Sequence, residues 1–430
     1  MGLDKFKVIV AGGGPIGLTT AHALSRAGID FVVPEHGVSV TTDDAGASLV
    51  LWPQGLRVLA QLGLRGRLEE IRAEMKCTKT MTADAYKYKE TYALEAVKRN
   101  HGARQTVFHR AHLLRALYDS LSETDEARIL TNKKVMDIAV TVLTVEVTVR
   151  CNDGSSYNGQ IVIGADGVHS KVRQSMRELA VKSGTSDINE EKPYLSGYRV
   201  LWCTFPRQTG LEQGDSIESH GTDVSIQCLI SHDRSRVFIY ERLEKPTRDR
   251  VPYSQDDVEA LAARYGGLPI SETLKVKDVF SKRYMAGMAN LEEGIVKHWS
   301  WNRLVLVGDA CHEFTSTYGI GYKNGIQDVV VLVNELHQVM TLNRPGNSTP
   351  ALGTLTDALS RYQAARMESL SWMFRLFDRY IFPSIPGFDE FMVTHVVAKE
   401  ISKSFIFNFV NSKEYYQGTI PWKHVMASTT

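Results

Sequence analysis

The sequence of 430 residues is long enough for two or more domains, and 43% hydrophobic and 23% charged residues are typical of a globular protein. A net charge of +1 excludes strong electrostatic attraction to nucleic acid or acidic lipid. The five cysteines form no CxxC pair, and no apolar run reaches the roughly 18 residues of a membrane span. Since the N-terminus also lacks a signal-peptide pattern, these features predict a soluble, cytoplasmic protein.

The first predicted element is a βαβ unit with the sequence VIVAGGGPIGLTTAHALSRAGIDFVVPE. An apolar strand over residues 6–11 leads to a helix over residues 18–27 and a second strand over residues 29–33. A GxGxxG turn separates the first strand from the helix. Its glycines are Gly12, Gly14 and Gly17.

Each glycine of this turn has a distinct expected role. Gly12 permits the tight turn, Gly14 lets a pyrophosphate approach the backbone, and Gly17 lets the helix pack close to the strand. Glu35 follows at about the 20-residue spacing of an acid that binds a ribose hydroxyl. An acid at this position favours FAD or NAD over NADP.

Two later motifs distinguish FAD from NAD. The stretch IVIGADGVHSKVRQSM is a strand followed by Asp166 and Gly167, and RLVLVGDACHEF is a strand that ends at Asp309. An aspartate at the end of a strand can accept hydrogen bonds from a polyol such as the ribityl chain of FAD. A helix that begins near residues 321–324 offers free N–H groups to an anion or an electron-rich flavin edge. Together the three motifs favour FAD.

With these motifs in this order, the chain resembles the class A flavoprotein monooxygenases of the para-hydroxybenzoate hydroxylase type. Within that class it resembles the fungal FAD-dependent monooxygenases and epoxidases of indole-diterpene, meroterpenoid and indole-alkaloid pathways. The stretches that carry this second resemblance are DAGASLVLWPQGLRVLAQLGL, HRAHLLRALYD, GYRVLWCTF and GTIPWKH.

The resemblance implies an enzyme with FAD as cofactor and NADPH as a transient co-substrate. Oxygen would react through a flavin C4a-hydroperoxide to epoxidise or hydroxylate a large hydrophobic terpenoid or indole-alkaloid intermediate. The residues that the resemblance assigns to FAD binding are Gly12, Gly14, Gly17, Glu35, Gly46, Ala47, Arg110, Asp166, Gly167, Asp309, Gly321 and Tyr322.

Three residues are candidates on the substrate side. Arg199 interrupts the apolar strand GYRVLWCTF, where a charge must be paired or functional. The resemblance implies an arginine here that lies over the flavin; the alternative is an arginine on the exposed side of an edge strand. Asp44 is either an acid near the reacting centre or a loop residue bonded to its own backbone. Tyr240 either lines the pocket or packs in the sheet, and packing is favoured.

The chain departs from the family pattern after the second aspartate motif. Ser316 stands where the family usually has proline, and Ile320 where it often has glutamine. His36 replaces the arginine that commonly follows the ribose acid. Because the proline shapes the flavin environment, its loss leaves a non-redox cyclase or isomerase on the same scaffold as an alternative. An NAD-dependent dehydrogenase is a third possibility.

Other catalytic classes lack their motifs in this sequence. There is no HExxH, no zinc-spaced Cys/His set and no GxSxG nucleophile elbow, so no metal is expected.

The predicted fold class is α/β, with a Rossmann-like FAD-binding domain interleaved with a β-sheet substrate domain. The FAD-binding domain is expected at residues 1–75, 105–180 and 282–340, and the sheet at residues 76–104 and 185–281. Residues 341–430 form a C-terminal helical region. Its amphipathic stretch at residues 390–410 either packs on the FAD domain or makes a peripheral membrane or dimer contact, so that a monomer and a homodimer both remain open.

Overall fold

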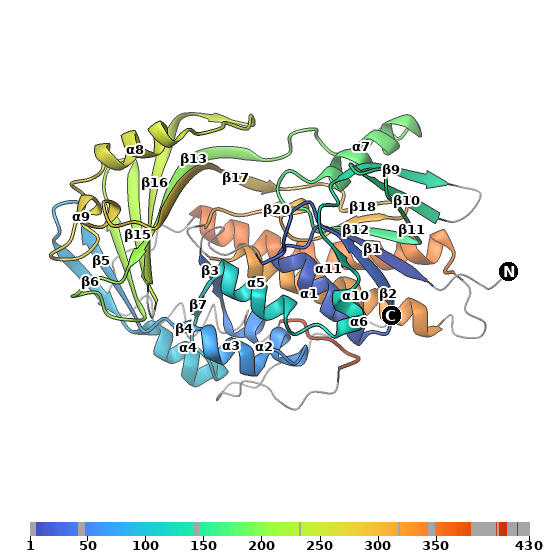
Figure 1. Ribbon diagram of the computed structural model, residues 1–430, viewed down its shortest axis with the longest axis horizontal. Coiled ribbons are helices and arrows are strands. Elements are labelled where there is room, and N and C mark those ends of the chain that lie inside the picture. The colour runs from blue at the N-terminus through green and yellow to red at the C-terminus, as the bar shows by residue number, and fades with distance from the viewer. Residues whose placement is uncertain are drawn as a thin grey trace.

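The computed structural model describes residues 6–41, 48–141, 146–231, 234–316, 319–342, 349–379 and 404–410, with the single positions 401 and 419. For residues 371–379 only the backbone is described. Two sheets dominate the architecture and lie at opposite ends of the view in Figure 1.

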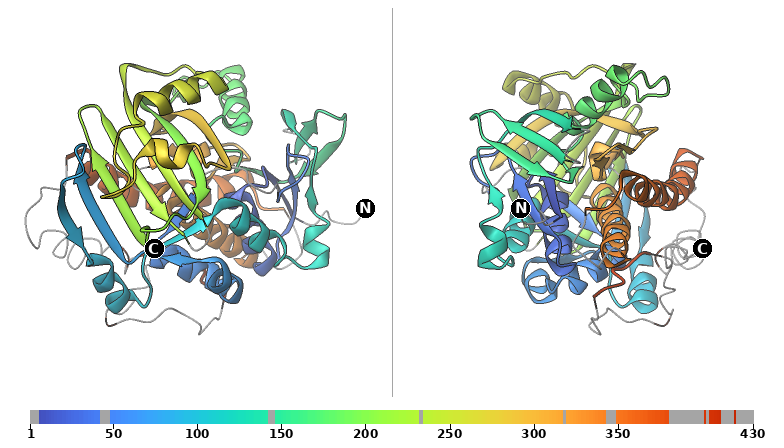
Figure 2. Two further views of the ribbon diagram at one scale, coloured as in Figure 1. Left: turned by 60° about the vertical axis from the view of Figure 1, so that its left-hand side comes forward. Right: turned by 90° about the vertical axis from the view of Figure 1, so that its right-hand side faces the viewer.

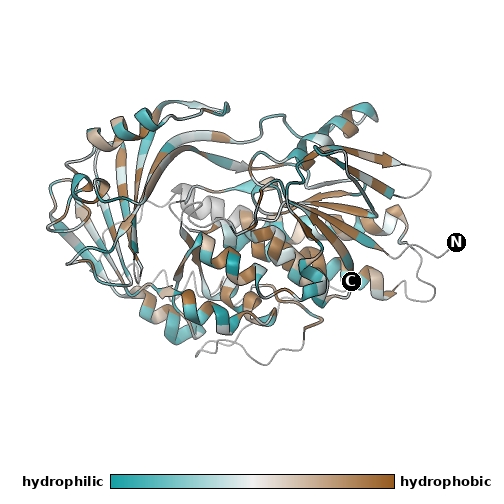
Figure 3. Cartoon of the chain, in the orientation of Figure 1, coloured by the Kyte–Doolittle hydropathy of each residue, from teal (hydrophilic) through white to brown (hydrophobic). Residues whose placement is uncertain are grey.

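The first sheet has six strands and contains the N-terminal strand. Its strands pair in parallel except for the antiparallel edge pair of β18 with β19. Side chains such as Val8, Ile9 and Val10 are fully buried, as expected for a parallel strand that is covered on both faces. Figure 3 shows these strands as hydrophobic along their length. The strand order is β18(Ser300–Trp301), β19(Leu304–Leu306), β12(Ile161–Gly164), β1(Lys7–Ala11), β2(Asp30–Pro34) and β8(Ile129–Leu130).

Helices and a small antiparallel sheet pack around this sheet. Four helices form one group of contacts: α1(Pro15–Arg26), α5(Arg110–Tyr118), α10(Gly321–Leu342) and α11(Leu352–Arg379). The small sheet contacts β1 and β12, and it consists of β9(Val135–Thr141), β10(Glu146–Cys151) and β11(Ser156–Gly159), accompanied by α7(Lys171–Lys182). In the right-hand view of Figure 2, the small sheet lies on one side and the helices α10 and α11 lie on the other.

The second sheet has eight strands. Their order is β20(His312–Glu313), β17(Met285–Ile295), β13(Leu195–Pro206), β16(Arg234–Thr247), β15(Val224–Ile230), β14(Asp215–His220), β5(Cys77–Thr82) and β6(Lys87–Thr91). The helices α8(Gln255–Arg264) and α9(Val276–Phe280) cover one face, where Leu201 and Ile239 are buried. On the other face Phe238 and Tyr240 pack with Val107 and Leu94. Those two residues come from β7(Thr106–His109), which pairs with β3(Ser48–Leu51) and β4(Ala73–Glu74), and from α4(Ala93–His101).

The remaining described helices are α2(Pro53–Gln61), α3(Arg65–Ile71), α6(Glu123–Glu126) and the 3-10 turn η1(Gly308–Ala310). Near the C-terminus, residues 404–410 form an irregular segment with a turn at residues 408–409. The Gln327 amide bonds both the N–H and the C=O of Phe405, and the Gln61 amide does the same for Phe407. This part of the amphipathic stretch therefore packs against the FAD domain.

The predicted α/β class is confirmed, but two boundaries are wrong. Strand β17 pairs with β13, so residues 285–295 belong to the eight-stranded sheet and not to the FAD-binding domain. Residues 404–410 are not helical, because side-chain amides and not helical carbonyls satisfy their backbone. In the part of the chain that the structure describes, no helix combines the length and the apolarity needed to cross a membrane.

Candidate functional site

The glycine turn between β1 and α1 is packed as the motif predicts. Gly12 has a φ of +101°, and a Cβ there would lie 2.8 Å from the Ala165 carbonyl oxygen. A Cβ on Gly17 would lie only 1.9 Å from the Gly12 carbonyl oxygen. A Cβ on Gly14, in contrast, would meet no protein atom within 4 Å. The turn is therefore closed toward the protein and open at Gly14, where the backbone can receive a ligand.

Glu35 lies at the end of β2 beside this turn. Its carboxylate accepts hydrogen bonds from the backbone N–H of Gly13 and from that of Gly37. The side chain is largely buried, and His36 Nδ1 lies 2.9 Å from Oε1. These contacts fix the position of the carboxylate. Each of its oxygens keeps a lone pair that can still accept a hydrogen bond from a ribose hydroxyl.

The N-termini of α1 and α10 meet at this turn. Ile16 of α1 packs against Gly308 and Gly325, and a Cβ on Gly325 would lie 2.4 Å from Ile16 Cδ1. Gly321 opens α10, and its Cβ position lies 4.0 Å from an Asp309 carboxylate oxygen. Two helix N-termini and one acid thus converge, an arrangement that suits an anion and a polyol together.

Arg110 is brought to the same place from another part of the chain. It is the first residue of α5 and follows the N-cap His109. Burial raises the pKa of the Asp309 carboxyl above its ordinary value, and the charges of His312 and Arg110 act in the opposite direction. Arg110 is therefore close enough to Asp309 to stabilise its ionised form.

Asp166 has a different task from the one expected. Its carboxylate accepts from Ser170 Oγ and from the N–H groups of Lys171 and Val172, at 2.5, 2.7 and 3.1 Å. It therefore caps the N-terminus of α7. The turn at Gly167, with a φ of +77°, still borders the glycine turn, because the Asp166 Cα is 3.1 Å from the Cβ position of Gly12.

Tyr322 packs between two helices. Its buried hydroxyl lies 3.1 Å from Thr19 Oγ1, so the ring packs between α10 and α1. Its contribution to the site is through the backbone at the start of α10.

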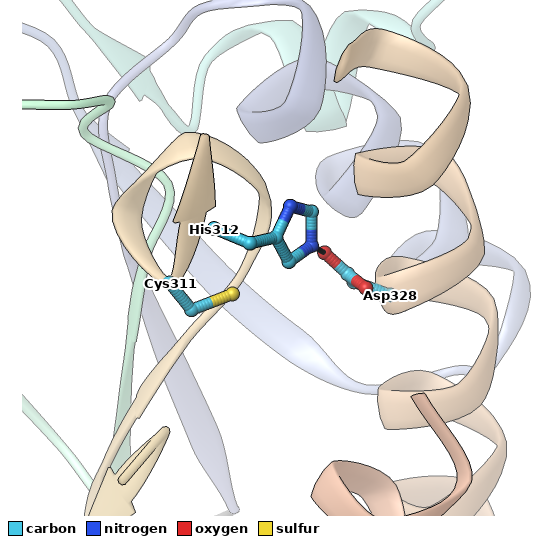
Figure 4. A group of neighbouring side chains, drawn as sticks. All are labelled: Cys311, His312 and Asp328. Atoms are coloured by element: carbon cyan, nitrogen blue, oxygen red, sulfur yellow. Dashed lines mark hydrogen bonds and ion pairs between the residues drawn. The ribbon is translucent and has the colours of Figure 1, made fainter. Parts of the chain in front are cut away.

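A buried polar cluster that the sequence did not reveal as a unit supports the turn at Gly308 (Figure 4). Asp328 on α10 accepts from the Gly308 N–H at 2.9 Å, from His312 Nε2 at 2.6 Å and from Arg366 Nε at 2.7 Å. Burial alone would raise the pKa of Asp328, but His312 and Arg366 hold it below its ordinary value. The available signal was an acid inside the apolar run GIQDVVVLV, since a buried charge must be paired.

Cys311, His312 and Asp328 also place their potential ligand atoms within 4.8 Å of one another. The chemistry of these donors does not suit a metal ion, because His312 and Arg366 already occupy the carboxylate. The Cys311 Sγ donates to the Gly308 carbonyl oxygen, and burial raises the pKa of its thiol well above the ordinary value. A protonated thiol is a poor ligand. The cluster is a brace for the turn.

Arg199, which the resemblance placed over the flavin, is held in an ion pair on one face of the large sheet. Arg199 is paired with Glu241 on the face of the sheet that α8 covers, and Glu241 also binds Arg264 and Tyr265 of that region. Side chains alternate along a strand, so Val200 and its neighbour Tyr240 face the opposite way. Arg199 is thus a structural ion-pair partner, and the charge in an apolar strand is explained by pairing.

Tyr240 does face the FAD-binding domain. It is buried beside Phe238, and its hydroxyl lies 3.4 Å from Gln227 Oε1 and within hydrogen-bonding reach of Ser316. Burial raises the pKa of this phenol above its ordinary value, so it stays protonated. Ser316, at the proline position of the family, therefore meets Tyr240 just before α10, and Ile320 is buried at the start of that helix.

Arg236 is a buried charge on the same face as Tyr240, and sequence reasoning missed it. It is buried on β16 and bonds Ser48 Oγ at 2.6 Å and Thr204 Oγ1 at 3.1 Å. The hydrogen bond to Ser48 connects the large sheet to β3. The candidates Asp44, Gly46 and Ala47 lie outside the described residues.

These features together fit FAD. The open backbone at Gly14 suits a pyrophosphate, Glu35 suits a ribose, and Asp309 in η1, beside the start of α10, suits the ribityl chain. The fold and this site define a dinucleotide-binding flavoprotein.

Comparison with known proteins agrees with this class. The family described as FAD binding domain matches residues 5–347. The FAD-dependent monooxygenase srdH of Neurospora crassa is 32% identical over 97% of this chain and 98% of its own length. The FAD-dependent monooxygenase esdpE of Penicillium shearii is 32% identical over 88% of this chain and 79% of its own length.

Solved structures share the fold. HpxO of Klebsiella pneumoniae, in complex with FAD and uric acid, matches with a TM-score of 0.68 and 20% identity over 92% of this chain and 90% of that one. The 2,6-dihydroxypyridine-3-hydroxylase of Arthrobacter nicotinovorans matches with a TM-score of 0.65 and 18% identity over 90% and 96%.

The chain belongs to the FAD binding domain family, and it is an FAD-dependent monooxygenase. The resemblance to the fungal class A enzymes is confirmed, and the NAD-dependent dehydrogenase alternative is excluded.

Proposed function

We propose that this monooxygenase uses NADPH and oxygen to epoxidise or hydroxylate a large hydrophobic terpenoid or indole alkaloid. Two electrons come from NADPH; one oxygen atom enters the substrate and the other leaves as water. FAD, when bound, supplies the hydride acceptor and the site of oxygen activation. The named relatives from fungi support the monooxygenase part of this proposal.

The observation that carries the proposal is the apolar face around Tyr240. Phe238 lies beside Tyr240 with ring centroids 6.1 Å apart, and the same apolar cluster includes the buried Leu229 and the partly buried Trp202 and Trp52. An apolar cluster with aromatic side chains at its edge supports a hydrophobic substrate next to it, from which water would be excluded.

In this proposal each residue of the site has a specific task. The glycine turn binds the pyrophosphate, and Glu35 accepts from the ribose. Asp309, with its charge stabilised by Arg110, accepts hydroxyl groups of the ribityl chain. Tyr240 donates a hydrogen bond from the substrate side, because its phenol remains protonated.

Substrate-stimulated consumption of NADPH tests the proposal. Purified protein loaded with FAD is mixed with NADPH and with terpenoid or indole-alkaloid candidates, while NADPH absorbance and dissolved oxygen are followed. The proposal predicts equal consumption of NADPH and oxygen that rises when a substrate is added. If no candidate raises either rate, the proposed reaction is wrong.

A second candidate function is a non-redox cyclisation or isomerisation on the same scaffold. The observation that favours it is Ser316, which stands at the family's proline position and lies within hydrogen-bonding reach of Tyr240. Turnover in anaerobic buffer without NADPH supports this candidate, and a strict requirement for both reagents rejects it.

A further inference from the structure

Glu313 is an acid beside the cofactor site to which none of the tasks above applies. It belongs to β20 and pairs with Gly294 of β17. Its carboxyl lies within hydrogen-bonding reach of the Asp309 carboxyl. Among the described residues, the buried Glu313 Oε2 finds no hydrogen-bond donor. A carboxylate in this position would be uncompensated, whereas a protonated carboxyl is satisfied by donating to Asp309.

The charges around Glu313 favour its neutral form. Burial comes first, followed by the negative charges of Asp309 and Glu292; all raise the pKa of Glu313 well above the ordinary value, against the opposing effect of Arg173. The groups that face the pair from the surrounding elements are Asp309 on η1, Glu292 on β17, Arg173 on α7, Tyr194 before β13 and, toward Asp309, Arg110 on α5 with His312 and Asp328.

Arg173 does not form the missing ion pair. Its guanidinium donates to the Ala310 carbonyl at 2.9 Å and to the Val168 carbonyl at 2.6 Å, and it stacks over the Tyr194 ring at 4.9 Å. The Tyr194 hydroxyl in turn donates to the backbone oxygen of Asp309, at 3.0 Å. The Arg173 guanidinium is therefore committed to backbone carbonyls and to the Tyr194 ring.

We propose that Glu313 is a positioning residue for FAD: in its protonated form it donates a hydrogen bond to Asp309 and holds that carboxylate toward the hydroxyl groups of the cofactor. Two adjacent carboxyl groups cannot both ionise cheaply, so one keeps its proton and serves as the donor. Loss of this proton breaks the hydrogen bond and adds a negative charge close to Asp309 and to the cofactor phosphates. This inference rests on the assignment of Asp309 to the cofactor site proposed above.

The test is the dissociation constant of FAD as a function of pH. FAD is titrated into the whole chain freed of flavin, with quenching of flavin fluorescence as the readout, from mildly acidic to alkaline pH. We expect the wild-type dissociation constant to rise about tenfold or more as Glu313 loses its proton. Glu313→Gln keeps a donor that does not titrate, so its FAD affinity stays near the wild-type value and is insensitive to pH. Glu313→Ala weakens binding about tenfold at every pH.

Glu292→Gln is the matched control. It removes a neighbouring charge but no hydrogen bond to Asp309, so the pH dependence remains and its midpoint moves to lower pH. The inference is overturned if Glu313→Gln titrates as the wild type does, or if Glu313→Ala binds FAD with wild-type affinity.

Asp309→Ala separates this inference from the assignment on which it rests. If Asp309→Ala leaves FAD binding unchanged, the assignment of Asp309 fails and Glu313 loses its role with it. If Asp309→Ala weakens binding by at least about tenfold while Glu313→Ala does not, the Glu313 inference alone fails. Thermal unfolding of each flavin-free variant checks that the fold persists.

Discussion

Gly17 is packed against Gly12 so closely that a methyl group on Gly17 would lie 1.9 Å from the Gly12 carbonyl oxygen. Neither residue can move away at low energetic cost, because the obstructing atom belongs to the backbone. Between these two residues in the same motif, a methyl group on Gly14 would meet no protein atom within 4 Å. The two glycines therefore serve different purposes, packing at Gly17 and ligand access at Gly14.

This contrast predicts different effects of the same substitution. Gly17→Ala is expected to lower the free energy of unfolding by about 3 kcal/mol or more. Gly14→Ala, at a φ of −68° and a ψ of −175° that alanine adopts freely, is expected to change it by less than about 1 kcal/mol. Gly14→Ala should nevertheless weaken FAD binding about tenfold to a hundredfold, because its methyl group occupies the cofactor's space. Urea unfolding of flavin-free protein and FAD titration measure the two effects, and a Gly14→Ala variant with wild-type affinity would contradict this division.

The buried brace around Asp328 predicts a loss of stability on neutralisation. Asp328→Asn leaves Arg366 and His312 facing an uncharged amide in the interior, and we expect a loss of about 3–5 kcal/mol in the free energy of unfolding. Asp187→Asn, which removes an exposed ion pair with Lys297, is the control and should leave the urea midpoint unchanged.

The same brace predicts a specific dependence on pH. The pKa of Asp328 is held below its ordinary value of 3.8 in the folded protein. Its contribution to stability is therefore present above the unfolded value and is lost as the pH falls through the folded pKa. Acid unfolding followed by circular dichroism should show a smaller loss of stability between pH 5 and strongly acidic pH in Asp328→Asn than in the wild type; parallel curves would rule out this contribution.

The position of Tyr240 predicts an effect on catalysis without an effect on cofactor binding. Tyr240→Phe removes the hydroxyl that reaches Gln227 and Ser316 but keeps the ring in its stack on Phe238. We expect kcat/KM for oxygenation to fall about tenfold, with FAD affinity unchanged. Tyr265→Phe, on the α8 side of the sheet, is the control and should keep wild-type kcat/KM. A Tyr240→Phe enzyme as active as the wild type would remove Tyr240 from the substrate side.

For Arg199 we expect the opposite result, an effect on stability without an effect on catalysis. Arg199→Ala takes one partner from Glu241, which keeps Arg264 and Tyr265, so the free energy of unfolding should fall by about 1–2 kcal/mol. FAD affinity and kcat/KM should not change, because the side chain lies on the face that α8 covers. A stable Arg199→Ala variant with strongly reduced kcat would instead restore the role over the flavin that the family resemblance implied.

Much of the cofactor site could be predicted from local sequence. The strand, glycine turn, helix and Glu35 lie within one βαβ unit, so their geometry depends on short-range backbone constraints, and the structure has the same elements in the same order. The place of Asp309 near this turn could be predicted because it follows a buried strand of the same sheet. The direction of the Asp166 and Tyr322 side chains could not, because each depends on a neighbouring helix that offered a better hydrogen-bond partner.

The sequence by itself determined the class of fold, the nucleotide-binding turn and the likeness to flavoprotein monooxygenases, since these follow from residue spacing and from alternation of apolar side chains. Only the tertiary structure decided which face of the sheet each charged or aromatic residue occupies. Arg199 and Tyr240 are on neighbouring strands, yet the register of β13 with β16 turns one toward α8 and the other toward the FAD-binding domain. The proximity of Glu313 to Asp309 and the brace from Asp328 to Arg366 likewise depend on how separate elements pack, which no local pattern encodes.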